Sequence, residues 1–125
     1  MAEYFPDAGL RDRMAPRLPD FDFSAVRFVV RLPWFVKFSA VPPLALAWRA
    51  TVHLHPDALA DAAGLEALLL HELVHLRQQR TDGLTRFALR YAGDYLRGRL
   101  RGLTREAAYR AIRYEVEARE ISGVG

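Results

Sequence analysis

The chain has 125 residues, of which 51% are hydrophobic and 26% charged, and its 18 basic and 15 acidic residues give a formal net charge of +3. This length and composition predict one soluble globular domain that buries a core without disulfide bonds or other covalent staples. The chain contains no cysteine, so a thiolate metal site is excluded and any metal must be held by histidine and carboxylate groups.

Charge and hydropathy narrow the class of protein further. Residues 1–10 are acidic and contain proline, so we expect no signal peptide and a cytoplasmic location. The most apolar stretch, residues 34–48, is interrupted by Lys37 and two prolines, whereas a membrane-spanning helix needs about 20 apolar residues. Arginines are frequent between residues 76 and 113, but they lack interleaved aromatic residues or a known reader motif. We therefore expect no specific nucleic-acid partner.

The hydrophobic periodicity changes from that of strands to that of helices after Pro56. In chain order we expect an irregular N-terminal arm over residues 1–24, strands over 26–32 and 44–55, and helices over 65–80, 84–100 and 104–121. The fold class is thus α+β, with a short antiparallel or mixed sheet followed by three helices. Residues 25–122 are expected to form the single folded domain.

The segment that carries chemistry is His-Glu-Leu-Val-His at residues 71–75. His71 and His75 are four residues apart on a predicted helix, so both rings lie on one face and can reach one metal ion. Glu72 is one position further around the helix, where it can take a proton from metal-bound water without being a ligand. Zinc suits such ligands and keeps a fourth position open for water.

The surroundings of this pair argue against an accidental match. Between residues 68 and 76, all positions besides the two histidines and the glutamate are leucine or valine, so the helix has almost no solvent-facing side. Burying two histidines and a glutamate there is costly unless another group compensates them. A bound metal ion does so, and the sequence therefore predicts a metal site.

A hydrolytic zinc site needs a third protein ligand. No histidine follows His75, so the C-terminal candidates are aspartate or glutamate. On a helical projection of the last helix, Glu115 is the carboxylate on the apolar stripe, whereas Glu117 falls on the charged side. We therefore expect Glu115 to be the third ligand. Asp94 is the alternative; it can instead orient a metal-bound histidine or pair with an arginine.

These two segments, residues 71–75 and Glu-Val-Glu-Ala at 115–118, resemble the gluzincin metallopeptidases, in which His-Glu-x-x-His precedes a glutamate on a later helix. The interval of 40 residues between His75 and Glu115 is similar to that in integral-membrane prenyl-protein proteases and small bacterial zincin-like domains, whose later motif is Glu-x-x-Ala-Asp. Glu115 and Ala118 match that motif. Arg119 stands where those families carry an aspartate that supports a metal-bound histidine.

The resemblance, which covers residues 44–120 loosely, implies a minimal zincin-like domain and a zinc-dependent metallopeptidase acting on a peptide or protein. His71, His75 and Glu115 would hold one Zn²⁺, and Glu72 would be the general base. In zincins an edge strand pairs with the substrate backbone, and residues 50–54 are expected to be that strand.

Several further residues are candidates for contact with the substrate or with the metal ligands. Thr51 and His53 are expected to contact substrate, with ordinary strand positions as the alternative. Tyr91 can stabilise a tetrahedral intermediate or simply pack in the core. Gln79, one turn beyond His75, and Arg119 are expected near the metal ligands.

Two other functions remain open on sequence grounds. A zincin-like fold without turnover would serve as a binding or structural zinc module, and the small size of the chain and Arg119 favour that reading. Membrane-surface association through residues 34–48 and the C-terminal arginines is the third hypothesis. For residues 34–48, a core strand or a dimer contact is the alternative.

Overall fold

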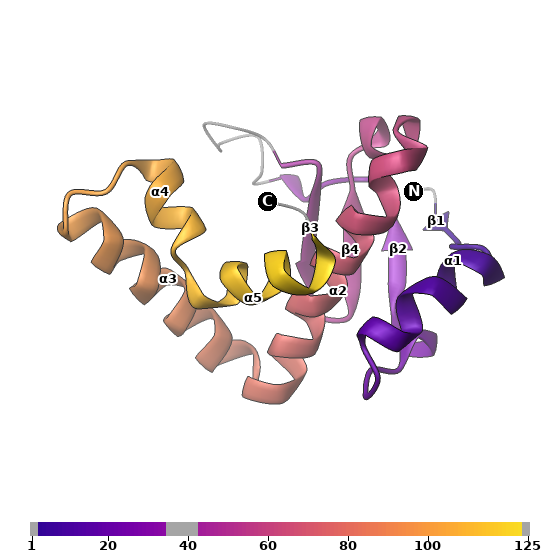
Figure 1. Cartoon of the computed structure of the whole chain (residues 1–125), viewed down its shortest axis with the longest axis horizontal. Coiled ribbons are helices and arrows are strands. Elements are labelled where there is room, and N and C mark those ends of the chain that lie inside the picture. The colour runs from indigo at the N-terminus through magenta and orange to yellow at the C-terminus, as the bar shows by residue number, and fades with distance from the viewer. Residues whose placement is uncertain (1–2, 35–42, 124–125) are drawn as a thin grey trace.

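The computed structural model describes residues 3–34 and 43–123, and its architecture is α+β, as predicted (Figure 1). The strands are β1 (Glu3–Tyr4), β2 (Arg27–Val29), β3 (Ala45–Trp48) and β4 (Thr51–Leu54), and the helices are α1 (Ala8–Met14), α2 (Ala62–Asp82), α3 (Leu84–Leu100), α4 (Arg105–Arg110) and α5 (Arg113–Ser122). In the view of Figure 1, α1 lies at one end of the molecule and α3 and α4 at the other, with α2 between them. Within the described ranges, no helix is long and apolar enough to cross a membrane. Most of the apolar stretch 34–48 falls on residues 35–42, outside the described part.

The four strands form one mixed sheet in the order β1-β2-β4-β3. Strand β2 pairs in parallel with β4, whereas β1 pairs with β2 and β3 with β4 in antiparallel fashion. Val52 and Leu54 are fully buried and belong to the same apolar cluster as the buried face of α2. Because side chains alternate along a strand, Thr51 and His53 lie on the opposite face of the sheet.

The segment predicted as one strand over residues 44–55 is a hairpin. Arg49 and Ala50 both adopt left-handed backbone conformations, with φ of 53° and 64°. A two-residue loop with positive φ at both positions matches the right-handed twist of the flanking strands. The buried side chain of Gln79 secures this turn, accepting from the Arg49 N–H at 3.1 Å and donating to the Ala47 carbonyl at 2.9 Å. The sequence hides the turn because neither glycine nor asparagine marks it.

The N-terminal segment corrects a second expectation, because residues 3–24 are not an irregular arm. Asp7 caps helix α1 by accepting a hydrogen bond from the Leu10 N–H at 2.8 Å. The helix buries Leu10 and Met14, which are four residues apart, and the following chain adds Leu18 and Phe21 to the same core. The N-terminal segment is therefore part of the domain.

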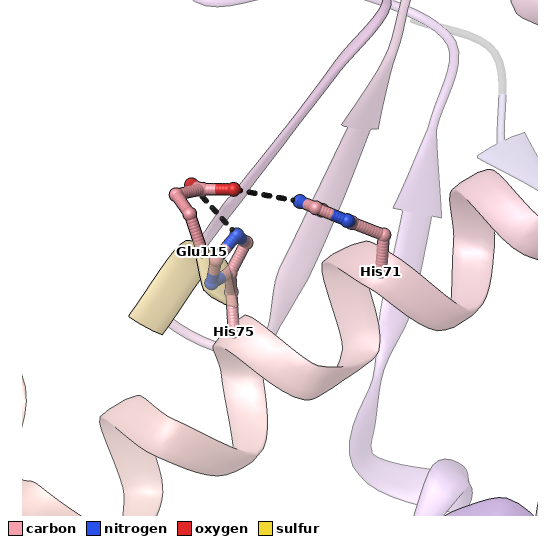
Figure 2. A group of neighbouring side chains, drawn as sticks. All are labelled: His71, His75 and Glu115. Carbon is pink, nitrogen blue, oxygen red and sulfur yellow. Dashed lines mark hydrogen bonds and ion pairs between the residues drawn. The ribbon is translucent and has the colours of Figure 1, made fainter. Parts of the chain in front are cut away.

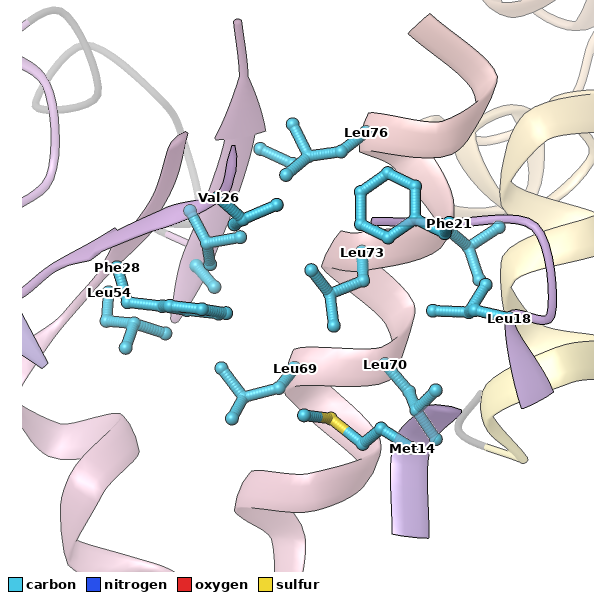
Figure 3. Packing of buried hydrophobic residues seen from close by; sticks show 14 of the residues in the cluster. Met14, Leu18, Phe21, Val26, Phe28, Leu54, Leu69, Leu70, Leu73 and Leu76 are labelled. Atoms are coloured by element: carbon cyan, nitrogen blue, oxygen red, sulfur yellow. The ribbon is translucent and has the colours of Figure 1, made fainter. Parts of the chain in front are cut away.

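Helix α2 is the centre of the core, as its leucine content predicts. Leu69, Leu70, Leu73 and Val74 have no exposed surface, and Figure 3 shows leucines of α2 packed between the strands and the N-terminal segment. The helix is longer than predicted because it starts at Ala62, where the side chain of Asp61 caps it by accepting from the Gly64 N–H. The helix face turned away from the sheet packs against α5 and α3.

The last predicted helix is divided into α4 and α5 at residues 111–112. Ile112 adopts an extended conformation (ψ 128°) and is completely buried in a small cluster with Phe87 and Tyr114. The first N–H of α5, that of Arg113, donates to Asp94 at 3.1 Å. No proline or glycine marks the break, so periodicity alone does not reveal it.

Candidate metal centre

Helices α2 and α5 bring two histidines and one glutamate together in the interior (Figure 2). His71 and His75 lie one turn apart on α2, with ring centroids 4.9 Å apart, and Glu115 faces them from the first turn of α5. His71 Nε2 is 2.9 Å from Glu115 Oε1, and His75 Nε2 is 3.0 Å from Glu115 Oε2. One potential ligand atom from each residue lies within 4.8 Å of the others.

The three side chains are shielded from solvent, with exposed fractions of 13% for His71, 7% for His75 and 3% for Glu115. Burial by itself raises the pKa of Glu115, but the hydrogen bond with His71 and the close approach of His75 outweigh it and hold that pKa well below its usual range. Burial lowers the pKa of His75, whereas its close contact with Glu115 and the charges of Glu72 and Glu115 raise it to about 8. Without metal, a proton on His75 therefore balances the Glu115 carboxylate, and a bound cation can take the place of that proton.

Gln78 fixes the tautomer of His75. Its amide nitrogen donates to the Tyr114 carbonyl at 3.0 Å and to Glu117 at 2.8 Å, so its oxygen faces His75 Nδ1 at 2.8 Å. Nδ1 must then carry a proton, which leaves Nε2 of a neutral His75 as a lone pair directed at the site. Metal-bound histidines typically donate their other N–H in this way.

The ligand atoms therefore fit a metal ion. Although His75 Nε2 is close to Glu115, it has no well-aligned hydrogen bond to any described residue, and the same is true of the buried His71 Nδ1. A nitrogen lone pair 3.0 Å from a carboxylate oxygen is unfavourable unless a proton or cation lies between them. Two imidazoles and one carboxylate are a ligand set that zinc accepts in hydrolytic sites.

Glu72 follows His71 on α2 and is 7% exposed. Burial raises the pKa of its carboxyl group, against the opposing influence of His75 and His71. A carboxylate with a raised pKa beside a potential metal ion is suited to accept a proton.

Tyr91 of α3 reaches the same site. Its hydroxyl donates to Glu115 Oε2 at 2.5 Å. Burial and the charge of Glu115 raise the pKa of Tyr91, so the phenol stays protonated and remains a donor. The same two causes raise the pKa of Tyr109 on α4, which is 43% exposed. The structure thus places Tyr91 against the third candidate ligand.

Three other predicted residues have partners away from the candidate ligands. Asp94 accepts hydrogen bonds from the backbone and side chain of Arg113 and from Arg97, so it anchors the start of α5 rather than joining the ligand set. Gln79 holds the β3–β4 turn. Arg119 donates to the Arg110 carbonyl at 2.6 Å.

The predicted substrate strand needs a correction. Residues 51–54 form β4, which is paired on both sides, so they do not offer a free hydrogen-bonding edge. Among the described strands, β3 is the edge strand on that side, and it packs against α2. Thr51 and His53 lie on the sheet face turned away from α2 and are not brought to the metal ligands. The hidden two-residue turn caused the error. It folds the predicted strand into a hairpin, in which β3 takes the edge of the sheet and β4 lies between β3 and β2.

Gln78 is the residue that sequence reasoning missed. It lies three residues after His75, on the same helix face, and is 5% exposed. A buried glutamine one turn from a candidate ligand is a usable signal, but the sequence offers two adjacent glutamines and does not say which one meets His75.

The fold and the site define a small α+β domain with a buried His-His-Glu set between two helices. The chain belongs to the eCIS core domain family, whose model matches residues 6–83, more than half of the sequence. That match runs from just before α1 to the end of α2 and includes His71, Glu72 and His75, whereas Tyr91 and Glu115 lie beyond it. Comparison with curated proteins gave no match. Comparison with solved structures gave none either.

Proposed function

We propose that the chain is a zinc-dependent hydrolase of peptide bonds. The observation that carries the proposal is the convergence of His71, His75 and Glu115, with Glu72 beside them on the same helix. Bound zinc supplies Lewis acidity, polarising a carbonyl and lowering the pKa of a coordinated water molecule to about 7. The preference for peptide bonds rests on the gluzincin resemblance.

Each residue has a separate task in this reaction. Glu72 accepts a proton from the attacking water and passes it to the leaving amine. Gln78 holds the proton of neutral His75 on Nδ1, so that Nε2 is the nitrogen available to zinc. Tyr91 holds the Glu115 carboxylate through its hydroxyl. His71 and His75 lie within the family match, whereas Glu115 lies outside it. The third ligand would therefore come from α5, in the part of the chain after residue 83.

One observation favours a second candidate, a zinc module without turnover. Structural zinc sites are closed, whereas catalytic sites keep a position open to water and substrate. The three candidate ligands and Glu72 are largely buried. A cavity lies nearby and is lined by Gln78, but neither His71 nor Glu72 lines it, so it does not open onto them. Membership of the eCIS core domain family is compatible with such a role in an assembly with other proteins.

The variant Glu72→Gln separates the two candidates. It removes the proton acceptor and leaves all three candidate ligands in place, so zinc content should stay at the wild-type level. A peptide-library cleavage assay on zinc-loaded protein should show cleavage by the wild type and none by Glu72→Gln. The matched control is Glu120→Gln, an exposed glutamate on α5, which should cleave normally. A zinc-loaded wild type that cleaves no peptide would favour the module.

A further inference from the structure

Helix α3 has a second apolar stripe on its outer side. Leu89, Leu96 and Leu100 are 69%, 57% and 79% exposed, and their spacing of seven and four residues places them on one side of the helix. Gly93 lies on the same side, with open space where a side chain would start. The inner side buries Phe87 and packs against α2 and α4. Figure 1 shows α3 at the end of the molecule away from the sheet.

Arginine is the only charged residue type on the exposed sides of α3. Arg86, Arg90 and Arg97 flank the leucine stripe on one side and Arg99 on the other, and all four are exposed. The one acidic residue of the helix, Asp94, is 9% exposed and is engaged by Arg113 and Arg97. The outer side therefore has an apolar centre and cationic borders. A complementary binding partner would offer an apolar region next to anionic groups.

We propose that α3 is a membrane-surface helix that binds an anionic lipid bilayer. At about 100° per residue, Arg90 and Arg99 project about 90° to either side of the leucine stripe. Their side chains therefore extend parallel to a flat surface that the leucines contact, which suits a bilayer better than a partner helix. With the leucines inserted at the acyl boundary, the guanidinium groups lie at the level of the lipid phosphates.

Other occupants match the surface less well. A second copy of α3 would set arginine against arginine, which is repulsive. A nucleic acid would meet the arginines but has no apolar surface for three exposed leucines. The inference does not depend on the proposed function, because it uses neither the metal ligands nor Glu72.

The test is co-sedimentation of the full chain with lipid vesicles. The expected result is binding to vesicles of phosphatidylcholine mixed equally with phosphatidylglycerol, and no binding to phosphatidylcholine alone. Arg86→Gln should weaken binding about fivefold, the contribution of one basic residue near an anionic surface. The double variant Leu96→Ser/Leu100→Ser should weaken it at least tenfold, since burial of each leucine drives insertion. Raising the salt concentration should also weaken binding.

Matched controls use exposed apolar and basic residues outside α3. Phe5→Ser, at a phenylalanine 72% exposed between β1 and α1, and Arg17→Gln, after α1, should bind like the wild type. All four variants alter exposed positions, so circular dichroism should show the wild-type fold in each. The proposal is overturned if the wild type does not sediment with anionic vesicles, which would leave an acidic protein as the occupant. It is also overturned if the leucine variant binds as well as Phe5→Ser.

Discussion

The two adjacent glutamines of α2 offer a matched test of how the candidate metal centre is held. Both are buried, with exposed fractions of 5% for Gln78 and 4% for Gln79, and both link α2 to another segment through hydrogen bonds. Only Gln78 touches a candidate ligand, through its 2.8 Å contact with His75 Nδ1. Replacing each in turn by methionine keeps the side-chain volume similar and removes the hydrogen bonds.

The two variants should lose stability alike and zinc affinity unequally. Each substitution leaves buried backbone groups without a partner, which costs about 1–3 kcal/mol of unfolding free energy. Gln78→Met also frees the His75 ring and its tautomer, and loss of such a partner typically weakens metal binding by about 10–100-fold. Gln79→Met should bind zinc as the wild type does, because its contacts are to the β3–β4 turn.

The assays are urea denaturation for stability and competition with a chromophoric chelator for zinc affinity. The affinity comparison is made at a urea concentration of zero, where both variants are folded. Equal zinc affinities for the two variants would refute the reasoning, because the contact with His75 would then contribute nothing to the site. A large loss confined to Gln79→Met would refute it as well.

Three further predictions concern Tyr91, His75 and the β3–β4 turn. Tyr91→Phe removes the hydroxyl that holds Glu115, and zinc affinity measured by chelator competition should fall about tenfold with the fold intact. Zinc affinity should fall about tenfold for each pH unit below about 8, because zinc must displace one proton from His75, whose pKa is about 8 without metal; titrations across this range test it. Without metal the sign is reversed: since this pKa lies above the value of 6.5 in the unfolded chain, the His75–Glu115 pair stabilises the protein fully below pH 6.5 and is lost as the pH rises through 8. Ala50→Gly should raise the unfolding free energy by about 1 kcal/mol, because glycine accepts the left-handed conformation at φ 64° without steric cost; urea denaturation measures the gain.

Local chemistry made much of the site predictable. A histidine pair four residues apart on a leucine-rich helix has few structural interpretations, and the apolar side of the last helix singled out Glu115. The structure brings these residues together. Within α5 the projection was valid because the helix break at residues 111–112 lies before Glu115.

Two of the misplaced elements, the β3–β4 turn and the α4–α5 break, share a physical cause, because tertiary contacts decided them. Arg49 and Ala50 turn the chain although neither favours a left-handed conformation, and Gln79, thirty residues away, holds the turn. The α4–α5 break is stabilised by burial of Ile112 and by Asp94 on another helix. Helix α1 is only seven residues long, too short for its periodicity to stand out. None of these contacts is visible in a local sequence window.

The central claim is that His71, His75 and Glu115 hold a zinc ion, and metal content measured by mass spectrometry tests it most directly. The comparison uses the purified wild type, Glu115→Gln and the control Glu120→Gln, each after exposure to zinc and removal of the excess. We predict about one zinc per chain in the wild type and the control, and a large loss in Glu115→Gln. A folded wild type that neither contains nor takes up zinc would contradict the account, as would full zinc content in Glu115→Gln.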